Sequence, residues 1–299
     1  MRGYENSEVV AFRAAWKAMQ PDGYQGLEPV EAFRAGFDEQ NGAIPVAAGC
    51  RVEEVKLGGC TGERLTPAAG GTNGILVYLH GGGHVFGSAR SHRHMVSRIA
   101  DAANMVAYVS DHRLAPENPY PAGLDDAVSF YGAIRERDPD TPVVLAGESA
   151  GGNLAAALVL RLAVEHQRMP DRVYLLSPWL DMTQSGETIE GLAGNDLMIS
   201  GQSLEDCAVY YAADHDRQDP LISPLFGDLT SFPPTLVQVS GDEVLLSDSL
   251  RFVERAALAG CQVELQVWPE MVHAWPLFHT ALSDGGRAMG AAAHWMSKA

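Results

Sequence analysis

The sequence predicts an α/β fold built on a mainly parallel sheet. Short apolar runs rich in Val, Ile and Leu alternate with stretches of helical composition over most of the chain, an arrangement typical of a parallel sheet flanked by helices. Most of these runs are nearly continuous, as expected for strands that are covered on both faces. Two of them lead directly into glycine-rich turns, at residues 80–88 and 147–153, where such sheets carry binding and catalytic groups.

Size and composition indicate an ordinary globular chain. It has 299 residues, of which 46% are hydrophobic and 20% charged, enough for one large domain or two small ones. Its apolar runs are far shorter than the roughly 20 residues that cross a bilayer, and its first residues lack the apolar core of a signal peptide. We therefore expect no membrane span and a cytoplasmic location. The net charge of −17 disfavours nucleic acid or an anionic membrane as a partner.

The four cysteines are widely scattered, without a Cys-x-x-Cys pair. This spacing supports neither a zinc site nor a disulfide framework. We expect buried free thiols.

Individual elements follow from periodicity. Apolar residues at steps of three and four mark a helix over residues 7–20, and a second stripe runs from Val30 to Phe37. Strands are expected at 51–57, 75–80, 105–110, 143–147, 173–177, 235–240 and 263–268. Helices are expected between the later strands, at 91–103, 123–136, 150–168, 247–259 and 281–298.

Residues 181–222 interrupt this alternation, because they contain polar loop and one short helix near 202–213 but no strand-like run. We expect an insertion above the sheet that packs with the N-terminal helices as a lid. The predicted division is therefore residues 1–45 as N-terminal helices contributing to a cap, residues 46–180 and 223–299 as the core, and residues 181–222 as the cap insertion.

Ser149 is the candidate nucleophile. It lies in GESAGGN, between a predicted strand and a predicted helix. A serine flanked as Gly147-x-Ser149-x-Gly151 needs small neighbours, because the turn is strained and the two backbones approach closely. The first amides of the helix also point at the place where negative charge would develop. A purely structural turn is the alternative, and the strand-turn-helix context favours the nucleophile.

The second glycine-rich turn, HGGGHVFGS, exposes backbone N–H groups that can converge on one oxygen. Gly82 and Gly83, together with the N–H of Ala150 after the nucleophile, are the predicted oxyanion hole. His80 is expected to brace this loop. A phosphate cradle is the alternative, but neither a following Lys-Ser/Thr nor a Gly-x-Gly-x-x-Gly pattern is present.

Five segments now combine into one pattern: HGGGHVFGS, DHRLAPENPYPAGLDDA, GESAGGN, SPWLDMT and PEMVHAW, in this order over roughly residues 75–280. The pattern resembles the bacterial hormone-sensitive-lipase-like esterases of the α/β-hydrolase superfamily. This resemblance implies an α/β-hydrolase fold under a helical cap, and carboxylic ester hydrolysis without a cofactor or metal. It also allows for a homodimer.

A serine hydroxyl needs a base, and the base needs an acid that orients it. His273 follows the last predicted strand, at the edge where catalytic groups of such sheets gather, and it fits the family pattern. The acid is less simple, because SGDEVLLSDS replaces the usual Asp-Pro-Leu-x-Asp-Asp. An ungapped overlay favours Glu243, whereas Asp242 needs a shift of one residue. The remaining alternative is that these carboxylates and Asp248 only cap the next helix, which suits Asp248 best.

The sequence therefore predicts a serine esterase that hydrolyses a small-molecule ester with a short or small acyl group through an acyl-enzyme. Hydrolysis of lactones, amides or carbamates by the same triad is an alternative. A non-catalytic small-molecule receptor with this fold is another, although a receptor need not keep a base. Candidates for the pocket wall, which could equally be core residues, are Trp179, Tyr210, Tyr211, Trp275 and Phe278.

Overall fold

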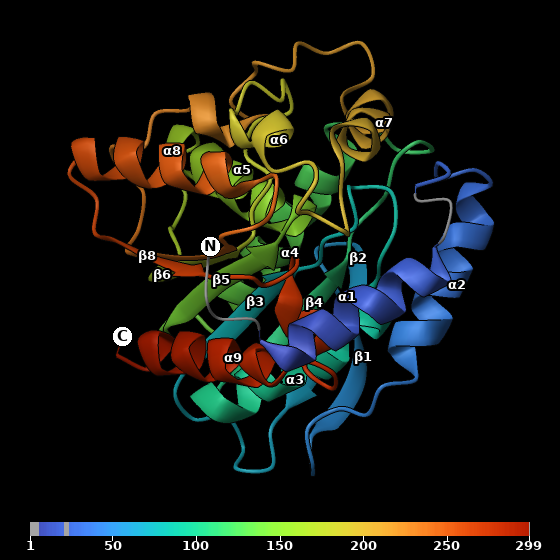
Figure 1. Ribbon diagram of the computed structural model, residues 1–299. Helices are drawn as coiled ribbons and strands as arrows, with labels where there is room; N and C mark the ends of the chain where they lie inside the picture. Colours follow the sequence, from blue (N-terminus) through green and yellow to red (C-terminus); the bar gives the residue numbers. More distant parts are fainter. Residues whose placement is uncertain (1–5, 21–23, 299) are drawn as a thin grey trace.

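The computed structural model describes residues 6–20 and 24–298, and this part of the chain forms one eight-stranded sheet (Figure 1). The strands are β1 (Arg51–Leu57), β2 (Cys60–Thr66), β3 (Ile75–Leu79), β4 (Val106–Asp111), β5 (Val143–Glu148), β6 (Arg172–Leu176), β7 (Thr235–Ser240) and β8 (Val263–Trp268). They follow the order β1-β2-β4-β3-β5-β6-β7-β8 across the sheet. β2 pairs antiparallel with β1 and β4, and all other neighbours pair parallel. The predicted mainly parallel α/β sheet is confirmed.

Helices cover both faces of the sheet. The helices of the described residues are α1 (Ser7–Met19), α2 (Val30–Gly42), α3 (Ala89–Ala103), α4 (Ala122–Arg137), α5 (Ala150–Val164), α6 (Thr188–Gly191), α7 (Gly201–Ala212), α8 (Leu246–Leu258) and α9 (Ser283–Met296), and α3, α4, α5, α8 and α9 contribute to the two cores of the sheet. Successive side chains of a strand point to opposite faces. Leu76 and Tyr78 of β3 accordingly pack in one core with residues of α3 and α9, whereas Ile75, Val77 and Leu79 pack in another with residues of α4, α5 and α8.

The sequence analysis did not predict two short elements, β2 and α6. β2 reads CTGERLT and lacks a continuous apolar run, because it pairs antiparallel near the edge of the sheet. Gly58 and Gly59, with φ of 57° and 88°, form the two-residue turn that joins it to β1, and such a glycine pair is a hairpin signal. α6 is a single turn within 181–222, where only one helix was expected.

The N-terminal segment and residues 181–222, called here the inserted segment, pack against each other. A third apolar cluster brings Leu27 and Val30 together with Leu204 and Cys207 of α7. Polar contacts reinforce this packing, because the Tyr24 hydroxyl donates to Asp206 at 2.8 Å and the Tyr210 hydroxyl donates to Glu28 at 2.6 Å. The two segments, distant in sequence, therefore form one layer.

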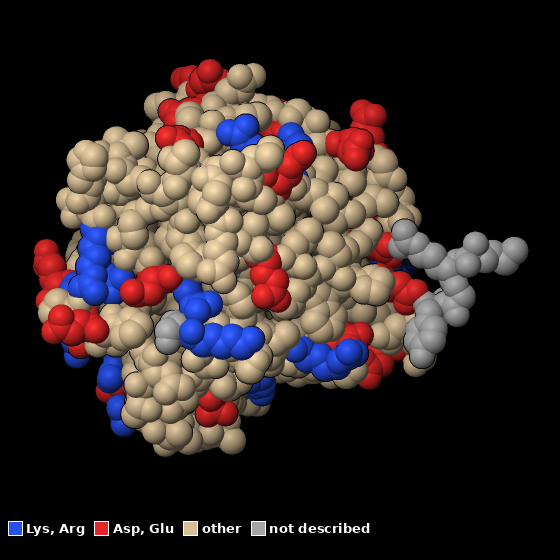
Figure 2. Space-filling view, turned by 90° about the vertical axis from the view of Figure 1, so that its left-hand side faces the viewer, with Lys and Arg blue, Asp and Glu red and all other residues tan. Residues whose placement is uncertain are grey.

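Charges of both signs share the face that Figure 2 presents. On the face that Figure 2 presents, Lys and Arg are interspersed with Asp and Glu, so no broad area there carries one sign. Among the helices that the structure describes, none is long and apolar enough to cross a membrane.

Candidate active site

Ser149 lies in the turn between β5 and α5, with φ 55° and ψ −122°. Holding a non-glycine residue in such a conformation costs on the order of 1–3 kcal/mol, which the surrounding structure must offset. A Cβ at Gly147 would lie 2.2 Å from the carbonyl oxygen of Gly151, and a Cβ at Gly151 would lie 2.1 Å from that of Leu79. Both positions therefore require glycine, and the close approach of strand and helix exposes the serine at the carboxyl edge of the sheet.

The predicted oxyanion-hole residues lie beside this turn. Gly82 and Gly83 have φ of 106° and 62°, which L side chains rarely adopt. Across the described residues, no hydrogen bond is found from the N–H of Gly82 or Gly83, and Ala150 is the first residue of α5, whose N–H has no acceptor within the helix. A Cβ at Gly83 would also lie 2.3 Å from the sulfur of Cys207, so α7 packs directly on this loop.

A buried ion pair ties the glycine loop to the nucleophile turn. Glu148, the residue before Ser149, accepts a hydrogen bond from the N–H of Gly81, and the same carboxylate oxygen lies 2.8 Å from Nε2 of His92. Burial alone would raise the pKa of Glu148, but the charge and hydrogen bond of His92 hold that pKa below its ordinary value. His80 Nδ1 lies 2.8 Å from the carbonyl oxygen of Gly81, as expected of a residue that braces this loop.

One cavity of about 720 Å³ brings together four of the six predicted site residues, without Ala150 and Glu243. Ser149, His273, Gly82 and Gly83 all line it. Its remaining walls are mainly apolar and come from the N-terminal segment, the inserted segment and the core; the aromatic members are Trp16, Tyr24, Phe33, Phe37, Phe86, Trp179 and Phe278. Mostly apolar lining with a few convergent polar groups is the ordinary character of a small-molecule site.

The two candidate acids point to different partners. Glu243 is fully buried, and its Oε2 lies 3.6 Å from Nδ1 of His273. The Ser177 hydroxyl donates to the same oxygen at 2.8 Å. Asp242 instead lies 3.5 Å from the guanidinium of Arg13 in α1. The geometry therefore joins Glu243, rather than Asp242, to the imidazole.

Burial and charge act on this pair in opposite ways. Burial would lower the pKa of His273, but the carboxylate of Glu243, with smaller contributions from Asp196 and Glu148, raises that pKa above its ordinary value. Burial raises the pKa of Glu243 despite the neighbouring imidazole. The neighbouring carboxylates thus stabilise the positive charge that an imidazole acquires when it accepts a proton.

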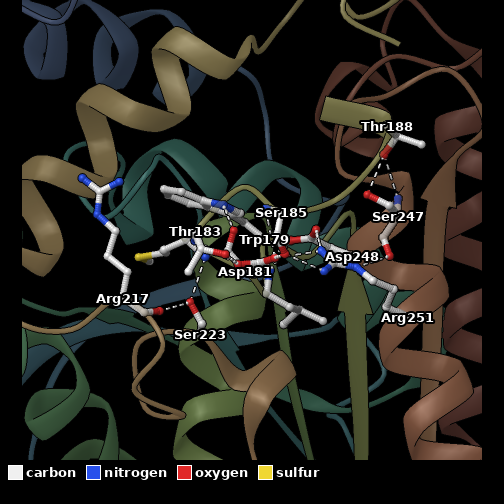
Figure 3. A network of polar contacts seen from close by, with 12 residues as sticks. Trp179, Asp181, Thr183, Ser185, Thr188, Arg217, Ser223, Ser247, Asp248 and Arg251 are labelled. Carbon is white, nitrogen blue, oxygen red and sulfur yellow. Dashed lines mark hydrogen bonds and ion pairs between the residues drawn. The ribbon is translucent and has the colours of Figure 1, made fainter. Parts of the chain in front are cut away.

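Asp248 has a different role from the helix cap that the sequence suggested. α8 has no side-chain cap, and one oxygen of Asp248 accepts the N–H groups of Leu180 and Asp181 at 2.8 and 3.0 Å. Arg251 lies 2.9 Å from both carboxylates, Asp181 and Asp248. Figure 3 shows that this network joins the start of the inserted segment to α8.

Expectations for the pocket wall and the cysteines are met in part. Trp179 and Phe278 line the cavity, but Tyr210, Tyr211 and Trp275 do not belong to its lining. Tyr211 and Trp275 are core residues. All four cysteines are free, yet only Cys60 and Cys207 are buried. Within residues 6–20 and 24–298, no group of three His, Cys, Asp or Glu side chains is placed to hold a metal ion.

Sequence reasoning missed Ser177, which has φ 45° and links the acid to the loop of the base. Its hydroxyl donates to Glu243 and accepts the N–H of Ala274 at 3.3 Å. The segment SPWLDMT carried a signal, since Ser177 directly follows β6, but a lone serine there does not reveal its partners.

Comparisons with known proteins identify the family of the chain. A family model described as alpha/beta hydrolase fold matches residues 76–277, and the chain belongs to that family. An acetyl-hydrolase of Streptomyces hygroscopicus is 38% identical over 275 residues, which cover 90% of each chain. An esterase of Acinetobacter venetianus is 33% identical over 264 residues, which cover 86% of each chain.

Solved structures give the same result at the level of the fold. The crystal structure of an esterase from the bacterial hormone-sensitive lipase family is 32% identical, covers 99% of both chains and superposes with a TM-score of 0.92. Within the α/β-hydrolases, the chain thus groups with the hormone-sensitive-lipase-like esterases. It is a carboxylic ester hydrolase of the serine type, which favours an enzyme over a non-catalytic receptor.

Proposed function

We propose that Ser149, His273 and Glu243 are the nucleophile, general base and acid of ester hydrolysis. The shared cavity carries this proposal, because the strained serine and the histidine both line it and Glu243 lies behind the imidazole. Ser149 attacks the ester carbonyl while His273 takes its proton; the same histidine then protonates the leaving alcohol. Water repeats the sequence on the acyl-enzyme. Glu243 keeps the imidazole in the required orientation and supports its charge.

The oxyanion forms where the N–H groups of Gly82, Gly83 and Ala150 converge. Two observations support this assignment: the positive φ of both glycines and the position of Ala150 at the first turn of α5. Donors fixed before the reaction stabilise developing charge without reorganisation, and one such donor is worth about 10²–10³ in kcat.

The experiment is Ser149→Ala, with hydrolysis of p-nitrophenyl acetate as the readout. The prediction is complete loss of turnover in a protein whose circular dichroism and melting temperature remain those of a folded chain. Ser203, a hydroxyl that also lines the cavity, supplies the control: Ser203→Ala retains turnover. Retention of activity by Ser149→Ala would refute the nucleophile.

The substrate is a small-molecule ester with a short or small acyl group. A cavity of about 720 Å³ that aromatic side chains bound on several sides supports this choice, and the relative from Streptomyces is named an acetyl-hydrolase. In a series of p-nitrophenyl esters, kcat/KM is expected to peak at short chains and to fall towards C16. A steady rise to C16 would contradict the proposal. Lactones, anilides and carbamates assayed beside the esters test whether the same triad prefers another acyl group.

We further propose the arrangement around this site. Residues 1–45 and 181–222 form a cap over a core of residues 46–180 and 223–299, supported by the cavity walls that both segments contribute; residues 1–5, 21–23 and 299 lie outside the described chain. We also propose that the enzyme acts in the cytoplasm and forms a homodimer. The position of β8 at the edge of the sheet, with Val267 exposed, supports the dimer.

A further inference from the structure

Arg13 of α1 contacts three segments at once. Its guanidinium donates to the carbonyl oxygens of Asn195 at 2.7 Å and Glu270 at 3.3 Å, and it lies 3.5 Å from the carboxylate of Asp242. Asn195 belongs to the inserted segment, Asp242 directly precedes the proposed acid, and Glu270 lies three residues before the proposed base. One side chain of the N-terminal helix thus holds both triad turns and the inserted segment.

Asp196 makes the complementary contacts from the inserted segment. Its Oδ2 accepts the N–H of Val244 at 3.0 Å, directly after the proposed acid. Its Oδ1 accepts the N–H groups of Met198 and Ile199 at 2.9 and 3.1 Å. Met198 and Ile199 line the cavity beside the nucleophile. The same carboxylate therefore shapes one cavity wall and holds the turn of the acid.

We propose that Arg13 and Asp196 are positioning residues for ester hydrolysis, which fasten α1 and the inserted segment to the turns that carry Glu243 and His273. The walls of the cavity and the alignment of acid and base then depend on the same contacts. This inference rests on the proposed triad, and the Ser149→Ala variant tests that triad separately.

The physical reason is the loose contact between acid and base. Glu243 Oε2 and His273 Nδ1 lie 3.6 Å apart, longer than an ordinary hydrogen bond, so this contact alone does not fix the carboxylate. The backbone on either side of Glu243 is instead held from outside, through Asp242 by Arg13 and through the N–H of Val244 by Asp196. Misplacement of a catalytic group by about 1 Å can cost about 10²-fold in rate.

Asp196 also contributes charge to the site. The charged groups that act on the imidazole are Glu243 from the turn after β7, Asp196 from the inserted segment and Glu148 from the end of β5, and all three raise the pKa of His273. Removing the charge of Asp196 therefore lowers this pKa. Since kcat/KM falls when the base of the free enzyme is protonated, its acidic limb should move to lower pH.

The test compares Arg13→Gln and Asp196→Asn with matched controls in the full-length enzyme, assayed on p-nitrophenyl acetate. Lys17→Gln removes a charge from an exposed position one turn further along α1. Asp216→Asn alters an exposed aspartate that, like Asp196, accepts a backbone N–H two residues ahead. We expect both controls to keep the kcat and pH profile of the wild type.

We expect Arg13→Gln and Asp196→Asn each to lower kcat by about tenfold or more, with a smaller change in KM. In Asp196→Asn the acidic limb of kcat/KM moves to lower pH, a shift that loosened packing alone does not produce. The double variant should lose less than the product of the two single losses, because both residues hold one turn.

The inference would be overturned by a wild-type kcat in both single variants, or by an acidic limb of kcat/KM that does not move in Asp196→Asn. If Ser149→Ala is inactive, the proposed triad still stands in that case. An active Ser149→Ala would instead remove the proposed function. Arg13 is one-quarter exposed, so its replacement by glutamine tests the inference even if Asp196→Asn fails to fold.

Discussion

At the scale of single residues, two adjacent carboxylates have separate tasks. Glu243 is fully buried beside the imidazole, whereas Asp242 contacts the guanidinium of Arg13. Glutamate has one methylene more than the usual aspartate, and the Ser177 hydroxyl that binds its Oε2 adds a further constraint on the longer side chain. The turn thus directs Glu243 to the imidazole and Asp242 to α1.

We expect Glu243→Gln to lower kcat by about 10³-fold or more, because an amide in this position favours the wrong imidazole tautomer. Asp242→Asn should cost at most about tenfold, since Asp242 contacts the guanidinium of Arg13 rather than the imidazole. Steady-state kinetics on p-nitrophenyl acetate separates the two. A larger loss in Asp242→Asn would transfer the acid to residue 242.

At the scale of elements, the sequence predicted what local pattern controls. Continuous apolar runs marked the buried parallel strands, and glycine spacing marked the turns that carry the proposed nucleophile and the proposed oxyanion hole. The strand β2 was not predicted, because its pairing with β1 and β4, rather than its own composition, determines its conformation. The contacts of Arg13, Ser177 and Asp196 were not predicted either. Arg13 and Ser177 contact carboxylates more than 60 positions away in the sequence, and Asp196 accepts a hydrogen bond from a backbone N–H group. Such contacts produce no periodic pattern in the sequence.

The junction between the inserted segment and α8 is testable at this scale. Asp248→Ala leaves the N–H groups of Leu180 and Asp181 without their acceptor, and each unsatisfied buried group costs about 1–3 kcal/mol. We expect the free energy of unfolding to fall by about 3 kcal/mol in urea titrations. Glu254→Ala, at an exposed position of the same helix, should change it by less than about 0.5 kcal/mol. Equal stability of the two variants would show that the network does not stabilise the fold.

At the scale of the whole molecule, β8 leaves one side of the sheet open. It pairs with β7 and forms the end of the strand order, and Val267 on it is 45% exposed. Unpaired backbone groups along an edge strand offer hydrogen bonds to a second strand. Pairing of two β8 strands would extend the sheet through both subunits.

The expected result in light scattering is a particle of twice the chain's mass. Val267→Lys places a charge in that contact and should shift the mass towards one chain, whereas Val164→Lys, at an exposed position on α5, should not. A wild-type protein that remains monomeric at micromolar concentration would contradict the dimer.

The contact between Gly83 and Cys207 limits which segments could replace residues 181–222. Because the sulfur of Cys207 occupies the space that a side chain at residue 83 would need, α7 and the loop of the proposed oxyanion hole must match each other in shape. A segment that replaces residues 181–222 would therefore need a small residue at position 207. A larger residue at position 207 would be tolerated only together with a change in the loop beneath it.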